Sequence, residues 1–538
     1  MSYRIILVWA LLAIVPINCA RAATIPTGCS VSALITAIET ANANSEADVI
    51  DLSPGCTYTL TAVHNTSLGD PEGLPVIMTD HPLDIHGHGA TIMRSTVSGT
   101  PEFRIMHVRV GNAAGTGGNA LFSMDGVTLE NGDVRSAQGS GGGIYLDPAQ
   151  STPGLVQLTQ VRIVGSRAYT GGGLSTSAPL ELSGSTVEGN HADAYAGGIL
   201  VASAPLTVSS SRIVGNTQGS ADLIADIGDA AYLISGGGGM GAFLAENLVV
   251  LDSEISGNEA WGIGGGGIGA LATPGILINT RVHHNVIRQP DSVDPSKGEM
   301  GSGGGVAVGS FSGAAALDFT IVRSAIHDNA ADTSGGGLGF AGAIRAAVSH
   351  TTVGRNSAGV RAGGIGDAAN QVLLDNVTVA GNTAARGAGI DIGLYTDFTG
   401  TNTTGQAWFI NTAIGDNSGS SDCYNDGGSV FDNLGSLLES DAGGANACDG
   451  ASGKGFALRA DPGLSPLADH GGPDPSYLPQ AGSPLINAGT SGWNSSPFDQ
   501  RGTCYQRIRG SAIDIGAIET GNAEVIFCAT FDPSIIAN

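Results

Sequence analysis

Lysine, aromatic side chains and long apolar segments are all scarce in this chain of 538 residues. Its 22 basic residues include only two lysines, Lys297 and Lys454, and they face 48 acidic residues, for a formal net charge of −26. A surface this acidic argues against nucleic acid and anionic lipid as partners, and it leaves cations and glycans open. After the first residues, no apolar run approaches the roughly 18 residues that a membrane-spanning helix needs. We therefore predict no transmembrane segment in the mature chain.

Motifs of several enzyme classes are also missing. The chain has no Cys-x-x-Cys pair, Walker loop, Gly-x-Ser-x-Gly elbow or zinc-protease helix. His86 and His88 could form a metal pair, but strand-like segments flank them and no third ligand lies nearby in the sequence, which favours a turn. We predict no metal site and no cofactor, and Ca²⁺ is the one ion that the acidic charge leaves open.

The first 23 residues have the pattern of an export signal. Arg4 precedes an apolar run over 5–15, and Ala20-Arg21-Ala22 has the small-x-small pattern of a cleavage site. Cys19 raises the alternative of a lipoprotein, although the residues before it are a poor lipidation context. We expect cleavage after residue 22 or 23 and a secreted or cell-surface protein associated with the outer membrane.

Glycine, in contrast, is abundant, with 85 residues that recur in one setting. Glycine runs precede an aliphatic residue at Ile144, Leu174, Ile199, Met240, Ile268, Val306, Leu338, Ile365 and Ile390. Asparagine follows the same rhythm at positions 190, 216, 258, 285, 329, 356, 382 and 417, and Ser166 takes its place one repeat earlier. Both residue types tolerate left-handed backbone, and stacked Asn amides can bond to one another, so both indicate repeated corners.

A β-branched residue stands three positions before each of these asparagines. The column comprises Val187, Ile213, Ile255, Val282, Ile326, Val353, Val379 and Ile414. The flanking positions vary freely, as expected of a half-buried strand that is repeated at one register. Repeats of about 26 residues are too short for helix-containing units and suit three short strands joined by turns. The sequence therefore predicts an all-β fold, a single-stranded right-handed parallel β-helix over residues 63–420.

Other segments are expected to close the two ends of this rod. Helical spacing of apolar residues over 30–44 predicts a cap within 24–62. Loops rich in Asp, Gly and Pro over 421–520 are expected at the other end, followed by a tail over 521–538. Six cysteines remain after signal cleavage, and an even number in an exported chain suggests three disulfides among 15 possible pairings. We predict neighbour pairing (Cys29 with Cys56, Cys423 with Cys448, Cys504 with Cys528), the alternative being free buried thiols.

Three stretches resemble known families. The segment from Cys29 through Cys56 to Leu60 resembles the CSLREA domain of bacterial surface β-helices, although the Leu-Arg-Glu element is replaced. The Gly-Gly-Gly-Ile and Ile-x-Gly-Asn elements are similar to polymorphic outer membrane protein repeats. The segments 461–462, 469–473, 482–489, 499–502 and 514–519 resemble the choice-of-anchor Q domain, without its usual Arg-Pro. The resemblances imply a surface or secreted β-helix and supply no catalytic residues.

Two long insertions occur at the same corner of the repeat, at 217–235 and 286–302. Insertions at one corner of a solenoid project from one face, which is often the binding face. A ligand or cation site between the loops is one interpretation, and tolerated surface decoration is the other. The candidate binding residues are Asp222, Asp226, Asp229, Asp291, Asp294 and Glu299.

A second set of candidates lies on the outward positions of a predicted strand. In the repeat alignment Arg212, Glu254 and Arg281 form one column, and His283 lies in the next. Asp252 is two residues from Glu254, hence about 7 Å away on a regular strand, which suits the carboxylate pair of an inverting glycosidase. The alternative is a surface ion-pair ladder worth about 0–1 kcal/mol per pair. The catalytic candidates are Asp252, Glu254, Arg281 and His283, and no catalytic residue is assigned beyond them.

Two function classes follow. The favoured expectation is a non-enzymatic, adhesin-like protein that binds an extracellular glycan or surface protein. The alternative is a polysaccharide lyase or glycoside hydrolase, because such enzymes place acids, Arg and sometimes calcium along one side of a β-helix. Fold alone does not decide between them.

Overall fold

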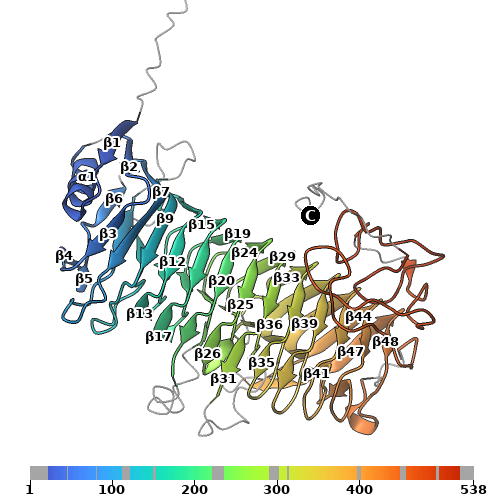
Figure 1. The fold of residues 1–538 in the computed structure, drawn as a ribbon. Helices are drawn as coiled ribbons and strands as arrows, with labels where there is room; N and C mark the ends of the chain where they lie inside the picture. The colour runs from blue at the N-terminus through green and yellow to red at the C-terminus, as the bar shows by residue number, and fades with distance from the viewer. Residues whose placement is uncertain are drawn as a thin grey trace, which may run out of the picture.

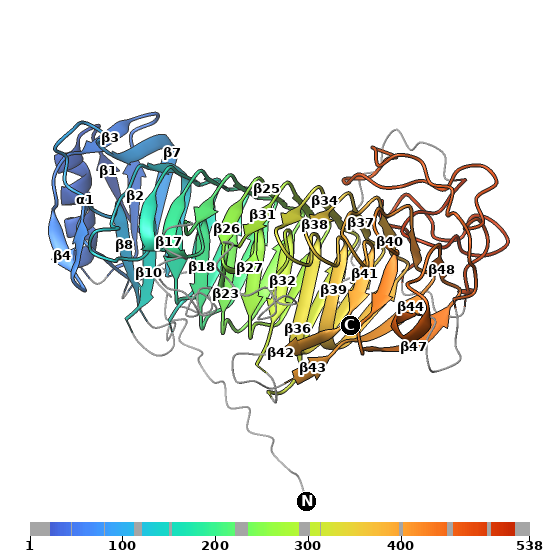
Figure 2. The ribbon, with the colours of Figure 1, turned by 90° about the horizontal axis from the view of Figure 1, so that it is seen from below.

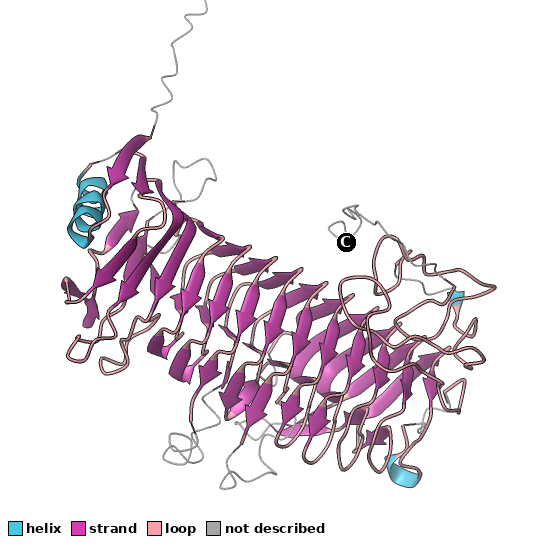
Figure 3. Ribbon diagram, in the orientation of Figure 1, coloured by secondary structure: helices cyan, strands magenta, loops and turns pink. Residues whose placement is uncertain are grey.

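The computed structural model describes residues 22–521, apart from 45, 80, 112–120, 150–152, 221–234, 290–301, 312–313, 397–401, 449–455 and 492–495. The described chain forms one elongated rod of stacked coils with a small cap at one end and a loop-rich region against the other (Figure 1). The cap carries the only long helix of these residues, and the rest of the rod is strand and turn (Figure 3). The predicted right-handed parallel β-helix is confirmed.

Each coil contributes strands to three faces, whose successive strands pair in parallel. The first face, after the glycine runs, contains β6 (Ile77–Thr79), β8 (Met106–Val110), β10 (Ile144–Pro148), β14 (Leu174–Thr176), β18 (Ile199–Ala202), β23 (Met240–Phe243), β28 (Ile268–Leu271), β32 (Val306–Gly309), the first halves of β36 (Leu338–Ser349) and β39 (Ile365–Asp375), β41 (Ile390–Ile392) and β46 (Cys423–Asn425). The second face contains β1 (Ala23–Thr27), β2 (Asp48–Leu52), the first halves of β7 (Leu83–Arg94) and β9 (Phe122–Glu130), β11 (Val156–Thr159), β15 (Leu180–Ser183), β19 (Leu206–Ser209), β24 (Leu248–Leu251), β29 (Gly275–Ile278), β33 (Leu317–Val322), the second halves of β36 and β39, β44 (Gln406–Ile410) and β47 (Ser429–Leu434).

The third face carries the asparagine repeat at its end. It contains β3 (Thr57–Leu60), the second halves of β7 and β9, β12 (Arg162–Val164), β16 (Thr186–Glu188), β20 (Arg212–Val214), β25 (Glu254–Ser256), β30 (Arg281–His283), β34 (Ala325–His327), β37 (Thr352–Gly354), β40 (Thr378–Ala380), β45 (Ala413–Gly415) and β48 (Leu437–Leu438). A short fourth sheet follows the corner, with β13 (Arg167–Thr170), β17 (His191–Tyr195), β21 (Thr217–Gln218), β26 (Glu259–Trp261), β31 (Val286–Arg288), β35 (Ala330–Ala331) and β38 (Ser357–Ala358). The view along the underside shows these layers side by side (Figure 2).

A few elements lie outside these columns. They are the hairpins β4 (Asn65–Ser67) with β5 (Asp70–Glu72) and β42 (Leu394–Thr396) with β43 (Asn402–Thr404), the pair β22 (Ser235–Gly237) with β27 (Ile263–Gly265), and the 3-10 turn Gly444–Asn446.

The β-branched column points into the rod as predicted. All eight of its members, from Val187 to Ile414, have no exposed surface, and they belong to one continuous interior cluster. Alternation along each strand places them there because every second side chain of a strand faces the same side.

The corner asparagines form a ladder along the rod from Asn190 to Asn417. Asn285 is typical: its Oδ1 accepts hydrogen bonds from the backbone N–H and the Nδ2 of Asn258, at 3.1 and 2.8 Å. Its own Nδ2 donates to Ile255 O and to Asn329 Oδ1, both at 2.9 Å. The glycine runs follow from this ladder, since a Cβ at Gly267 would come within 3.0 Å of the Asn285 amide and 2.7 Å of Gly305 O. Asparagine and glycine therefore recur together, because the asparagine amide leaves no space for a side chain at the glycine position beside it.

One inward position of the rod holds a carboxyl group. Asp367 pairs in register with Phe340 and Ile392, both interior residues, and is 1% exposed. Its Oδ1 accepts a hydrogen bond from the backbone N–H of Ala369 at 3.0 Å, and its Oδ2 has no partner among the described residues. Burial, with a small contribution from Asp391, raises the pKa of Asp367 to about 7. The folded protein therefore keeps this group protonated in mildly acidic solution.

Replacing Asp367 by Asn should stabilise the protein at alkaline pH. Between the unfolded pKa near 4 and the folded pKa near 7, only the folded state retains the proton, so stability declines as pH rises, by up to about 4 kcal/mol. Denaturant unfolding at about pH 5 and about pH 8 should show that decline in the wild type and a smaller one in Asp367→Asn. The exposed Asp318→Asn variant is the control, and an equal decline in all three proteins would contradict the assignment.

The cap is fixed to the first coils by its helix and a disulfide. Helix α1 (Val31–Ala43) begins at Ser30, whose side chain accepts a hydrogen bond from the N–H of Ala33, and it buries Leu34 and Ile38 on the open end of the rod. The predicted pairs Cys29–Cys56 and Cys423–Cys448 are both formed. Cys504 is also disulfide-bonded, and its predicted partner Cys528 lies outside the described residues, as does the predicted signal segment through residue 21.

The C-terminal loops do more than close the open end. Cys448 and Phe456 belong to the interior cluster, and the Phe456 ring packs against Phe409 of β44. The chain from 459 onward then turns back and packs on the outer side of the third face, where Leu485 and Ile515 contact Leu437 (Figure 1). The expectation that the whole region caps the end is therefore corrected. We call residues 459–521 the flanking region.

Candidate functional site

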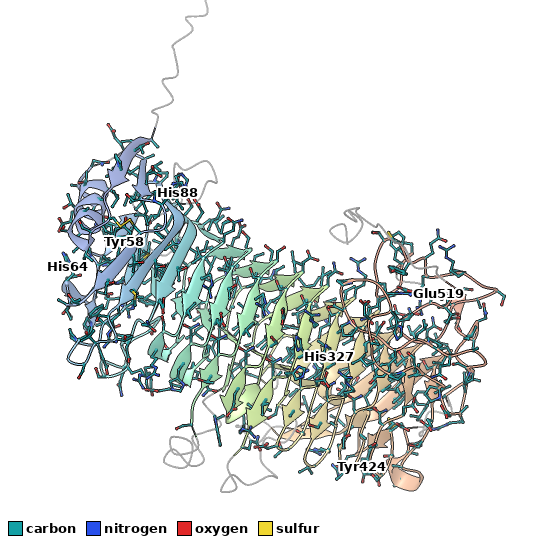
Figure 4. All side chains as sticks on the ribbon, viewed as in Figure 1. Tyr58, His64, His88, His327, Tyr424 and Glu519 are labelled. Carbon is teal, nitrogen blue, oxygen red and sulfur yellow. A yellow bond between two sulfur atoms is a disulfide. The ribbon has the colours of Figure 1, made fainter. Side chains whose placement is uncertain are left out.

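The outer surface of the third face changes character where the flanking region begins. Under that region the outward residues are small, because Tyr477 lies on them. A Cβ at Gly354 would come within 2.6 Å of the Tyr477 ring, and the Tyr477 hydroxyl donates to Ala380 O at 2.9 Å. On the coils that precede it, several outward residues are charged or imidazole-bearing. These are Arg212, Glu254, Arg281, His283 and His327, and Figure 4 shows His327 on this side of the rod.

Glu254 is the centre of this cluster. Its Oε2 accepts a hydrogen bond from Arg212 Nε at 3.0 Å and lies 3.7 Å from Nη2 of Arg281. Its Oε1 lies 3.2 Å from His283 Nε2 and accepts a hydrogen bond from the Ser256 hydroxyl at 3.0 Å. The predicted column of Arg212, Glu254 and Arg281, with His283 beside it, is thus brought together by three successive coils.

A chain of hydrogen bonds leads from Glu254 to the surface. The Nδ1 atoms of His283 and His284 are 2.7 Å apart, and His284 is exposed at a corner with φ of 55°. A carboxylate can only accept, so His283 Nε2 carries the hydrogen that faces Glu254. His283 Nδ1 is then the acceptor for His284 Nδ1–H, and in the neutral form of His284 the nitrogen without a hydrogen is Nε2, at the outer end of the chain. We call Glu254, His283 and His284 the histidine chain.

A second imidazole supports the first. The rings of His283 and His327 are stacked, with centroids 5.0 Å apart and planes within 2°. His327 Nδ1 lies 2.6 Å from Asp328 Oδ2, and Asp328 also accepts two hydrogen bonds from Arg355, at 2.9 and 2.5 Å. This arrangement fixes the His327 ring and, through the stack, the plane of His283.

The local environment lowers the pKa values of both His283 and Glu254. Burial, the His327 ring and the charge of Arg281 lower the pKa of His283 to about 4, so it is neutral in ordinary solution. Burial by itself raises the pKa of Glu254, but hydrogen bonds from Arg212 and Ser256 and the charges of the two arginines outweigh it and lower that pKa. The result is a neutral imidazole beside a carboxylate, with arginine side chains 58% and 37% exposed at its edge.

Asp252 does not belong to the cluster, and its predicted position on one strand face with Glu254 is wrong. β24 ends at Leu251 and β25 begins at Glu254, so Asp252 occupies the turn between them with φ of 48°. Its carboxylate accepts a hydrogen bond from Asn279 Nδ2 at 2.9 Å. The interpretation as an inverting carboxylate pair therefore loses its geometric basis.

The six acidic candidates of the two insertions, between Asp222 and Glu299, lie outside the described residues. Within the described ranges, no group of three or more His, Cys, Asp and Glu side chains is arranged to hold a metal ion. The strand-flanked histidines pair with carboxylates instead: His86 lies 2.5 Å from Asp125, and His88 lies 2.7 Å from Asp51.

Sequence reasoning missed His284, His327, Asp328 and, from the flanking region, Asp474. The repeat alignment contained a signal for the first three. His284 and Asp328 replace the glycine that usually precedes the corner asparagine, and His327 continues the column of His283 on the next coil. Asp474 is 147 residues after His327, the member of the cluster nearest to it in the sequence, and nothing in the repeat points to it.

Another buried charge cluster lies near the cap. Arg104 is fully buried and contacts Glu72 at 2.6 Å and Asp70 at 2.5 Å, both on β5. His107 lies between Glu72, at 3.1 Å, and Asp147, at 2.6 Å. Because these charges satisfy one another beneath the surface, we interpret the cluster as the attachment of the β4–β5 hairpin to the rod.

Comparisons with known proteins concern the architecture alone. No family model matches the chain, and no curated protein matches it. Among solved structures it is similar to the pectate lyase Pel9A (13% identity, TM-score 0.35, 89% of this chain and 90% of that one). It is also similar to the A-module of the Azotobacter vinelandii mannuronan C-5 epimerase AlgE6 (14%, 0.40, 80% and 91%) and to the periplasmic alginate epimerase AlgG (10%, 0.35, 71% and 75%). No helix among the described residues is long and apolar enough to cross a bilayer.

Proposed function

We propose that the protein acts on an extracellular polysaccharide that contains uronate units, by removing the proton adjacent to the sugar carboxylate. The histidine chain is the observation that carries this proposal. His284 Nε2 is an exposed base, and Glu254 stabilises the positive charge that develops as a proton arrives on the pair of imidazoles. The adhesin-like alternative would use the same surface without turnover.

The neighbouring arginines supply what an acidic substrate needs. Proton removal next to a carboxylate places additional negative charge on that group, and exposed guanidinium groups stabilise it. Arg212 and Arg281 present such groups at the edge of the cluster, and both lie against Glu254. In an otherwise strongly acidic protein, two partly exposed arginines beside a neutral base favour an anionic glycan over a neutral one.

The proposed reaction is a β-elimination. The base takes the proton from C5, the bond between C4 and the bridging oxygen breaks, and a double bond forms between C4 and C5. The leaving oxygen receives a proton from water, so no oxidant, reductant or cofactor is consumed. A carboxylate pair for hydrolysis is not assembled here, since Asp252 lies in a turn and bonds to Asn279.

A panel of polyuronates tests the proposal. The mature protein, with and without a chelator, should generate the ultraviolet absorbance of unsaturated uronate ends from at least one of them, and none from a neutral glucan. Binding of a polyuronate without any unsaturated product would favour the adhesin-like function, and neither binding nor product would contradict both.

Substitution of Arg212 by Gln should lower kcat/KM by about tenfold to a hundredfold, because a hydrogen bond to a charged group contributes roughly 1.5–3 kcal/mol. Arg162 offers a matched control: it lies two strands away in the same outward column, is similarly exposed and pairs with Glu188. Arg162→Gln should retain wild-type activity. Equal losses in the two variants, measured by initial rates on the active polyuronate, would mean that general surface charge and not this site is responsible.

A further inference from the structure

The flanking region is joined to the third face by specific polar contacts. The Thr352 hydroxyl donates to Gln500 Oε1 at 2.5 Å, and the backbone N–H of Ala517 donates to the Thr378 hydroxyl at 2.9 Å. Tyr477 fills the space above Gly354, as described above. The segment 464–480, which includes Tyr477, is therefore seated immediately beside the histidine chain, on the next coils of the same face.

Asp474 lies within this segment in an unusual setting for a carboxyl group. It is 6% exposed, and its Oδ2 has no hydrogen-bond partner among the described residues. The charged groups that act on it come from the rod: Arg281 on β30, which attracts its charge, and Asp252 in the β24–β25 turn, which repels it. A buried carboxyl without an ion pair is stable in contact only while it is protonated.

Burial accordingly raises the pKa of Asp474 to about 7, against the attraction of Arg281. In a released segment the same side chain faces water and has an ordinary pKa near 4. The seated state thus holds a proton that the released state lacks at intermediate pH. By linkage, docking of segment 464–480 on the rod is most favourable at acidic pH, and it becomes weaker as the pH rises towards 7.

We propose that Asp474 makes the docking of segment 464–480 proton-dependent, so that ionisation of its carboxyl group releases the segment from the rod beside Arg281. Release uncovers the outer side of β34 and β37 next to the histidine chain. Its effect on turnover rests on the proposed function, whereas the docking equilibrium itself does not.

Two other carboxyl groups near this interface also respond to pH. Burial raises the pKa of Glu519 to about 7, and burial with the charges of Glu439, Asp461 and Asp422 raises the pKa of Asp416 to about 6. They belong to other parts of the interface, so their contribution remains when Asp474 is neutralised. A comparison of single variants separates the contributions.

Hydrogen exchange across segment 464–480, corrected for the intrinsic exchange rate at each pH, measures docking in the full chain. Opening in the wild type should increase by about tenfold or more between pH 5 and pH 8. Asp474→Asn keeps the shape of the side chain without its ionisation, and it should remove most of that increase. Asp469→Asn, an exposed carboxylate of the same segment, should leave it unchanged.

A wild-type increase that persists in Asp474→Asn, or that Asp469→Asn removes equally, overturns the proposal. The pH profile of kcat/KM on an active polyuronate gives the second readout. If exchange behaves as expected while no polyuronate is processed, the docking proposal stands and the proposed function fails. If a polyuronate is processed while exchange is independent of pH in all three proteins, the proposed function stands and the docking proposal fails.

Discussion

Substitution of His284 by Asn should reduce turnover of the polyuronate substrate by at least about a hundredfold while the protein remains folded. General-base catalysis by a positioned side chain typically contributes 10²–10⁴ in rate, and in this site the outer nitrogen of His284 is the group that faces solvent. Asparagine is the appropriate replacement because His284 occupies left-handed backbone, with φ of 55°, which asparagine tolerates. Initial rates at saturating and limiting substrate should show that kcat falls while KM changes little.

His88 supplies the control for this variant. It is also a corner histidine, with φ of 50°, and it also contacts a carboxylate, at 2.7 Å from Asp51. His88→Asn should therefore reproduce any effect of losing a corner imidazole from the rod and keep wild-type activity. If His284→Asn remains fully active on a substrate that the wild type processes, the base lies elsewhere. Below about pH 4 the His283 imidazole becomes charged, so its Nδ1 no longer accepts the hydrogen of His284 and the chain is broken.

The repeat was readable in the sequence because it obeys local rules. Eight β-branched positions at one offset from an asparagine can only be satisfied by stacked coils with a shared interior, and Val282 and its equivalents have no exposed surface. The outward column of Arg212, Glu254 and Arg281 followed from the same alignment, since strands in register place equivalent positions in line. Together with the neighbouring column that holds His283, periodicity therefore predicted the fold and four members of the site.

The alignment could not predict features that depend on exceptions to the repeat or on contacts between residues far apart in the sequence. Asp252 stood two residues from Glu254, but a corner between them turns its side chain away, and strand boundaries of this kind are the least predictable feature of a sequence. Asp474 reaches the site only because the flanking region folds back along the rod, and no periodic signal reports that path. Because no periodic signal reports that path, the flanking region was expected at the end of the rod, whereas it packs on the outer side of the third face.

The rod positions its chemistry through its corners. His284, Asp328 and Arg355 occupy equivalent corner positions on successive coils, each with φ near 55° and each immediately before a ladder asparagine. The hydrogen bonds of the ladder fix the backbone of that corner from both neighbouring coils. The side chains that directly precede the ladder asparagines are therefore held at a constant spacing from coil to coil. A site built on adjacent coils requires this preorganisation.

This argument predicts a large effect on stability when the ladder is broken away from the site. Asn356 is 1% exposed, and its Oδ1 accepts hydrogen bonds from the N–H and the Nδ2 of Asn329, at 3.0 and 2.9 Å. Its Nδ2 donates to Ile326 O and to Asn382 Oδ1. Asn356→Ala removes the partner of two buried N–H groups of Asn329 and of Ile326 O, at roughly 1–3 kcal/mol each before relaxation, so we expect a loss of about 4–6 kcal/mol. Denaturant unfolding measures it, with the exposed Asn370→Ala variant as control.

The form of the unfolding curve matters as much as its midpoint. In a stacked protein each coil contacts only its neighbours, so cooperativity between the two halves passes through every layer in turn. A weakened layer at Asn356 should separate the unfolding of the coils before it from that of the coils after it, and a single transition should become two. Serine, which occupies the corresponding corner at Ser166 and accepts no bond from a preceding asparagine, should give an intermediate loss at position 356. Unfolding of Asn356→Ala with the wild-type midpoint and a single transition would mean that core packing alone holds the coils together and that the ladder only sets their register.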